Sequence, residues 1–107
     1  ITEWLEIKEQ KKKIGKLNVN SIVTGADYNE NYKILALTST KKFNNYYLII
    51  INDFSFEQIN NSNINTYEIP IGKTQVEAVK IIDNNNFWIT SEDEKNSKSA
   101  RLMKLKL

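Results

Sequence analysis

The chain has 107 residues with no cysteine and no histidine, and its 15 basic and 13 acidic residues give a formal net charge of +2. Without cysteine there is no disulfide, thiol nucleophile or thiolate-bound metal, and without histidine the commonest general base and metal ligand are missing. We therefore expect no catalytic residues of the triad type. The near balance of charge gives no electrostatic basis for binding nucleic acid, and no apolar run is long enough for a membrane span.

Apolar residues recur with period two, or in short runs rich in Ile, Val and aromatic residues, along almost the whole chain. This pattern is typical of β-strands and not of amphipathic helices. It predicts strands at residues 2–8, 13–19, 21–28, 32–39, 45–52, 65–71, 75–82, 86–91 and 100–107. Asparagine-rich connections between them predict turns, because asparagine tolerates a left-handed backbone and bonds its own main chain.

Two local features refine this picture. Phe87 and Trp88 are adjacent in a predicted strand, so their side chains are expected on opposite faces of a sheet. The charged, serine-rich stretch at residues 91–99 is expected to form an exposed hairpin loop, because a strand pattern resumes directly after it.

The most informative feature is an internal repeat, in which the segment 23–39 resembles the segment 76–91. Both read as valine, a polar residue, a small residue, an apolar strand, an asparagine-rich turn, a second apolar strand and a closing Thr-Ser. A repeat of about 40–50 residues with four strands describes a propeller blade. The sequence therefore predicts an all-β fold made of antiparallel four-stranded blades of a β-propeller.

The strands divide into about two blades, so residues 1–107 are expected to form a partial β-propeller within a larger ring. Residues 1–19 would end one blade, 21–71 would form a full blade, and 75–107 would supply three strands of a last blade. We expect the chain to begin inside a longer gene product, with the missing fourth strand upstream of Ile1. The remaining blades would join in cis, or the exposed sheet edges would drive self-association.

Several segments resemble a β-propeller family of Bacteroidetes, in particular its C-terminal blades. They are residues 23–29, 32–38, 47–54, 75–78 and 88–92. Proteins of this kind are secreted or surface-associated, so the resemblance implies an extracytoplasmic location. It also implies a binding or scaffold role toward a protein or carbohydrate ligand, because the shared motifs are structural and not catalytic.

Acidic residues stand where the predicted inner strands begin or end, and these strands line the central channel of a propeller. Glu77 is the strongest metal-ligand candidate, because Val76-Glu77-Ala78 resembles the Glu-Gly entry to inner strands in metal-dependent lactonase-type propellers. A Ca²⁺ ion would be the expected cation, but it needs six to eight oxygen ligands, more than two blades supply. The ligand-binding candidates are Glu77, Glu92, Asp27 and Thr24.

A simpler interpretation of the same acids stays open. Asp27 and Asp83 would be turn residues, and Glu77 and Glu92 would be solvated or would bond neighbouring amides. The leading functional hypothesis is a non-enzymatic propeller module for binding or scaffolding, without a cofactor. The alternative is a fragment of a metal-dependent propeller hydrolase or lactonase, with acidic residues at the channel mouth.

Overall fold

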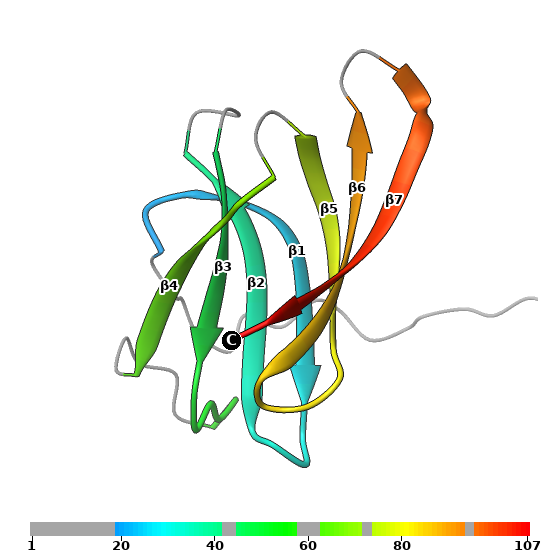
Figure 1. Cartoon of the computed structure of the whole chain (residues 1–107). Coiled ribbons are helices and arrows are strands. Elements are labelled where there is room, and N and C mark those ends of the chain that lie inside the picture. Colours follow the sequence, from blue (N-terminus) through cyan, green and yellow to red (C-terminus); the bar gives the residue numbers. More distant parts are fainter. Residues whose placement is uncertain (1–18, 42–44, 58–62, 72–73, 94–95) are drawn as a thin grey trace, which may run out of the picture.

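The computed structural model describes residues 19–41, 45–57, 63–71, 74–93 and 96–107, which fold into two antiparallel β-sheets (Figure 1). The expectation of an all-β fold is confirmed, since these residues form strands and turns. No helix in the described ranges is long and apolar enough to cross a membrane. The strands predicted at 2–8 and 13–19 lie outside the described residues, apart from Val19.

Each strand pairs with the next one along the chain, so both sheets are simple meanders. The first sheet contains β1 (Ile22–Asn29), β2 (Ile34–Thr40), β3 (Tyr46–Ile51) and β4 (Ile64–Ile69). The second sheet contains β5 (Thr74–Ile81), β6 (Asn86–Asp93) and β7 (Asn96–Lys106). All seven strands predicted beyond residue 20 are therefore present, with bounds shifted by a few residues.

The predicted loop at residues 91–99 is wrong in its extent. Strand β6 continues to Asp93 and β7 begins at Asn96, and these two residues pair across the hairpin. The register of the β6–β7 pairing shifts between Glu92, which pairs with Ala100, and Asp93, which pairs with Asn96. The backbone ladder needs only N–H and C=O groups, so a charged, serine-rich sequence continues it where hydrophobic periodicity predicts a break.

The internal repeat appears as two hairpins with the same register. Val23 pairs with Ser39 in the first sheet, and Val76 pairs with Ser91 in the second. In each hairpin the valine is followed by a register shift that skips one residue, Thr24 in β1 and Glu77 in β5. Both hairpins thus carry a β-bulge at the same place, and the polar residue of the repeat is the extra residue of the bulge.

The two sheets pack face to face around one hydrophobic cluster. The first sheet contributes Ile34, Ala36, Tyr46, Leu48, Ile50 and Ile69, and the second contributes Val76, Val79, Ile81, Phe87 and Ile89. Both faces of β2 and β3 are buried, and alternate residues of these strands join this cluster, which places one face of the first sheet at the interface. As predicted, Phe87 and Trp88 separate: Phe87 is fully buried in this cluster, whereas the Trp88 side chain is 39% exposed.

The register shows that opposite faces of the repeat meet at this interface. Leu37 pairs with Ala26, the residue after the small Gly25 of the first repeat. Ile89 pairs with Val79, the residue after the small Ala78 of the second repeat, so Leu37 and Ile89 occupy equivalent positions. Ile89 lies in the cluster between the sheets, but Leu37 belongs to a second cluster on the far face of the first sheet. The two repeat units therefore stack head to tail: one face of the first unit packs against the opposite face of the second unit.

Gly25 marks a close approach of β1 to β5. A Cβ atom at this position would lie 2.9 Å from the carbonyl oxygen of Glu77 and 3.0 Å from the Cα of Ala78. These distances are well inside ordinary carbon contacts of about 3.5–4.0 Å. The crossing of the two bulged strands thus requires a residue without a side chain in β1.

The turns use side-chain hydrogen bonds and left-handed residues. Asn20 and Asn63 have φ of 54° and 61°, as expected for asparagine, but Lys33 and Asp53 take the same conformation in two other connections. In the β1–β2 turn the asparagine acts instead through its side chain, because Oδ1 of Asn29 accepts a 3.1 Å hydrogen bond from the backbone N–H of Tyr32.

Candidate functional site

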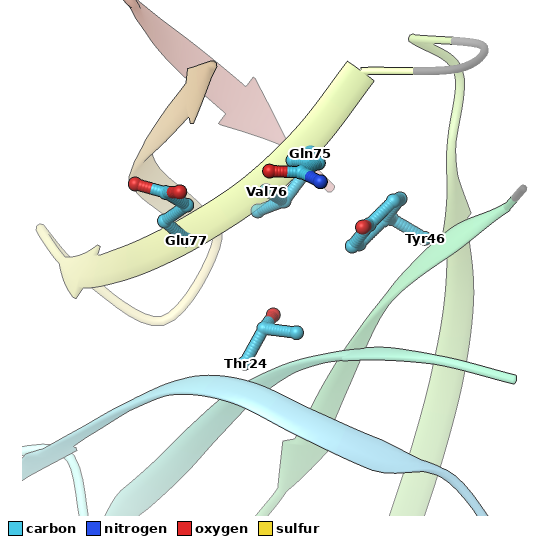
Figure 2. Close-up of a pocket in the computed structure, with 5 residues that line it drawn as sticks. All are labelled: Thr24, Tyr46, Gln75, Val76 and Glu77. Atoms are coloured by element: carbon cyan, nitrogen blue, oxygen red, sulfur yellow. The ribbon is translucent and has the colours of Figure 1, made fainter. Parts of the chain in front are cut away.

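A cleft of about 380 Å³ lies where the two bulges meet. It is lined by Thr24 of β1, Tyr46 of β3, and Gln75, Val76 and Glu77 of β5. Figure 2 shows Thr24 and Gln75 on opposite sides of this cleft, with the Tyr46 ring at one end and the Glu77 carboxyl group toward the other. The bulge residues of both repeat units are therefore neighbours in space, although they are far apart in the sequence.

The bulges themselves explain why these polar groups reach the cleft. An extra residue in one strand redirects its side chain out of the regular alternation. Thr24 is held by a 3.0 Å hydrogen bond from its Oγ1 to Oγ1 of Thr38 on the neighbouring strand. Glu77 and Gln75 flank the buried Val76, which forms the apolar floor on the β5 side.

Glu77 and Glu92 form a carboxyl pair across β5 and β6. A hydrogen bond between the two side chains, reinforced by repulsion between their negative charges, raises the pKa of Glu77 above its ordinary value of 4.5. Carboxyl groups with perturbed pKa values cluster at functional sites, so this pair marks the neighbourhood of the cleft as a candidate site. Within the described ranges, no group of three or more acidic residues is placed to hold a metal ion.

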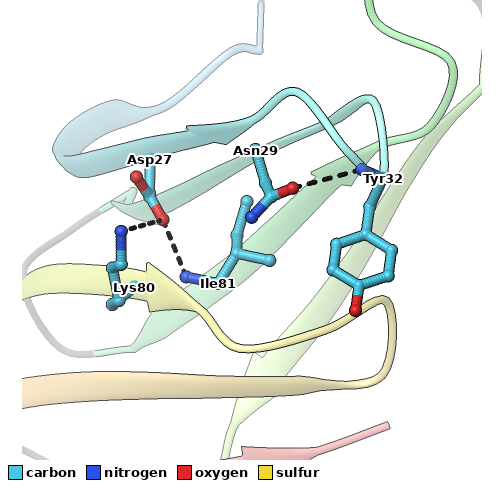
Figure 3. Close-up of polar contacts among 5 residues, drawn as sticks. All are labelled: Asp27, Asn29, Tyr32, Lys80 and Ile81. Carbon is cyan, nitrogen blue, oxygen red and sulfur yellow. Dashed lines mark hydrogen bonds and ion pairs between the residues drawn. The ribbon is translucent and has the colours of Figure 1, made fainter.

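Asp27 lies elsewhere and joins the two sheets. Its Oδ2 accepts a 2.8 Å hydrogen bond from the backbone N–H of Ile81 and lies 3.9 Å from Nζ of Lys80 (Figure 3). The Asp27 side chain is 19% exposed, so this hydrogen bond is shielded from water more than a surface contact. Asp27 therefore satisfies the N–H of a β5 residue and is not among the residues that line the cleft.

Asp83 behaves as the turn residue that the simpler interpretation expects. Hydrogen bonds from the backbone N–H of Asn85 and the side chain of Asn86 lower the pKa of the Asp83 carboxyl. The structure thus brings together three of the four ligand-binding candidates, Thr24, Glu77 and Glu92, and separates Asp27 from them. Sequence reasoning did not single out Tyr46 or Gln75 as site residues, and for Gln75 the available signal was its place directly before the repeated valine.

Comparison of the chain with models of known protein families, with curated proteins and with solved structures finds no match. The function of this site has to be inferred from its own geometry.

Proposed function

We propose that the chain is a non-enzymatic binding module whose two sheets are blades of propeller type, belonging to a larger ring that works outside the cytoplasm. The observation that carries this proposal is the repeated unit with its matching bulges, stacked head to tail. A head-to-tail contact uses different faces of the two units, so the same contact can be repeated with further blades. The extracytoplasmic location is supported by the family resemblance.

The cleft between the bulges is the proposed ligand site. Thr24 offers a hydroxyl group, Gln75 an amide with both donors and acceptors, and Glu77 a carboxyl group, while Tyr46 supplies apolar surface. A hydroxyl-rich ligand matches this mixture of donors and acceptors better than an apolar one does. Carbohydrate is therefore the proposed ligand class.

Titration of the ¹⁵N-labelled chain with a panel of mono- and disaccharides tests this proposal. We expect saturable shifts of the backbone amides of Thr24 and residues 75–77, and about threefold to tenfold weaker binding in Gln75→Ala, since one hydrogen bond is lost. Glu68→Gln, which changes an exposed residue of β4, is the control and should bind as the wild type does. A panel in which no sugar shifts these amides would remove the carbohydrate proposal.

A metal-dependent hydrolase fragment is the second candidate, and the Glu77–Glu92 pair favours it. Two carboxyl groups supply at most part of the six to eight oxygens that Ca²⁺ requires, so further ligands would have to come from other blades. Calorimetry with Ca²⁺ and Mn²⁺ on the intact gene product, compared with its Glu77→Gln variant, tests this candidate. Heats that are negligible and equal in both proteins would exclude it.

A further inference from the structure

Strand β7 (Asn96–Lys106) has a free edge in the described part of the chain. It lies at the end of the second sheet, where β6 pairs with one side and no described strand pairs with the other (Figure 1). An edge strand of 11 residues presents a long row of backbone N–H and C=O groups that another strand can pair with.

The first sheet indicates which kind of strand would pair with the free edge of β7. Strand β7 is the third strand of its unit, as β3 is in the first sheet, and β3 pairs along its whole length with the antiparallel strand β4. The position equivalent to β4 is the free edge of β7. One more antiparallel strand there would give the second sheet the same four-stranded composition as the first.

A groove of about 440 Å³ lies next to this edge. Its apolar lining comes from both sheets and comprises Leu48, Tyr67, Ile69, Pro70, Leu105 and Leu107. The Tyr67 side chain is 42% exposed, although it faces the space between the sheets. A strand added to β7 would extend the second sheet over β3 and β4, so every second side chain of that strand would enter the groove.

The charge of β7 indicates the chemistry of the added strand. Between Asn96 and Lys106 the sequence contains Lys98, Arg101, Lys104 and Lys106 and no acidic residue. Met103 and Leu105 pair with residues of the buried face of β6, whereas Lys104 and Lys106 alternate with them and are exposed on the outer face. Opposite residues 103–106, an added strand would meet apolar residues on one face and lysines on the other, which suits alternating apolar and acidic residues. Nearer the start of β7 the pattern reverses, because the exposed Leu102 shares the face of Lys104, and Arg101 shares the face of Met103 and donates a hydrogen bond to Oγ1 of Thr74.

We propose that the free edge of β7 and the adjoining groove bind an extended segment of a partner polypeptide, antiparallel to β7, with alternating apolar and acidic residues. The backbone of the segment continues the second sheet, its apolar side chains fill the groove beside Tyr67 and Leu105, and its acidic side chains lie opposite Lys104 and Lys106. Pairing of β7 with a second copy of itself is disfavoured, because two basic strands repel each other. In a ring, the partner segment would take the place of the fourth strand that we expect upstream of Ile1 in the same gene product. The site is separate from the cleft at the bulges, so it stands whether or not the cleft binds carbohydrate.

The test uses the full 107-residue chain and a capped peptide of eight residues that alternates isoleucine and glutamate. We expect saturable shifts of the amides of residues 101–106 in ¹⁵N spectra, and binding that weakens at high salt. Lys106→Glu, which reverses a charge beside the groove, should weaken binding about fivefold, because an attractive cross-strand pair becomes a repulsive one. Lys33→Glu makes the same charge change in the exposed β1–β2 turn and should leave the affinity unchanged.

Tyr67→Ser tests the groove separately from the charge, since it removes apolar lining on the opposite sheet, and it should also weaken binding. The proposal is overturned by any of four results. The first two are no saturable binding of the alternating peptide, and equal binding of a peptide of the same composition without the alternation. The other two are shifts confined to one of the edge strands β1, β4 or β5, and concentration-dependent dimerisation of the chain through β7 without peptide.

Discussion

Replacing Gly25 by alanine probes the crossing of β1 and β5. The new Cβ would lie 2.8 Å from Oγ1 of Thr38, 2.9 Å from the carbonyl oxygen of Glu77 and 3.0 Å from the Cα of Ala78. Two of these three atoms belong to the backbone of β5, so a side-chain rotation cannot relieve the contact. The second sheet would have to move away from the first by about 0.5–1 Å to restore ordinary contact distances.

The expected cost follows from two opposing effects. Overpacking of a tight contact typically costs about 1–3 kcal/mol. Replacing glycine by alanine also restricts the unfolded chain, which stabilises the folded state by about 0.4–1 kcal/mol at a compatible backbone conformation. We therefore expect Gly25→Ala to lower the free energy of unfolding by about 1–2 kcal/mol.

Urea denaturation followed by far-UV circular dichroism measures this change. The midpoint should fall while the slope with denaturant stays the same, because the surface exposed on unfolding hardly changes. Ala26→Ser is the matched control, since it adds one atom at the exposed next residue of β1, and it should stay within about 0.5 kcal/mol of the wild type. A Gly25→Ala variant as stable as the wild type would refute the close approach of the two strands.

Three further predictions concern single side chains. Asp27→Ala should destabilise the chain by about 1–3 kcal/mol, because it leaves the Ile81 N–H without its acceptor. Asp27→Asn should cost less, because the amide oxygen can still accept this hydrogen bond. Equal losses of unfolding free energy in the two variants, measured by denaturation, would show that the hydrogen bond is unimportant. Ile89→Ala should cost about 2–5 kcal/mol, but Trp88→Ala much less, since only Ile89 is fully buried between the sheets, and the reverse order would contradict the assignment of faces. Because the pKa of Glu77 is raised in the folded state, its contribution to stability is present below pH 4.5 and is lost as the pH rises through the raised value. Glu77→Gln should therefore weaken the pH dependence of the thermal midpoint across that interval, and an identical pH profile would count against the carboxyl pair.

The strands were predictable because each carries its own local signal. Short apolar runs around Leu37, Ile49 and Ile89 indicate that a strand is present, and the period-two pattern at residues 103–107 also gives the alternation of its faces. The repeat indicated two similar strand–turn–strand units, and the structure gives these two hairpins a common register. The loop at 91–99 was misjudged because composition reports on side chains, whereas the continuation of β6 to Asp93 depends on backbone pairing with β7.

The site was predictable only in part. Thr24 and Glu77 follow from the repeat, since each is the polar residue after the repeated valine. That they face one cleft depends on how the two sheets stack, which no local pattern encodes. Asp27 occupies the equivalent place to Lys80, and its contact with the Ile81 N–H again requires the neighbouring sheet. The groove beside β7 likewise arises between two sheets, so it has no signature in either strand alone.

The head-to-tail stacking of the two repeat units is tested most directly by a nuclear Overhauser measurement between Gly25 and Ala78. A side chain built on Gly25 would lie 3.0 Å from the Cα of Ala78, so one α proton of Gly25 points toward the backbone of Ala78. The structure predicts cross-peaks from the Gly25 α protons to protons of Ala78. Cross-peaks from Gly25 that reach only β2, with none to β5, would contradict the stacking.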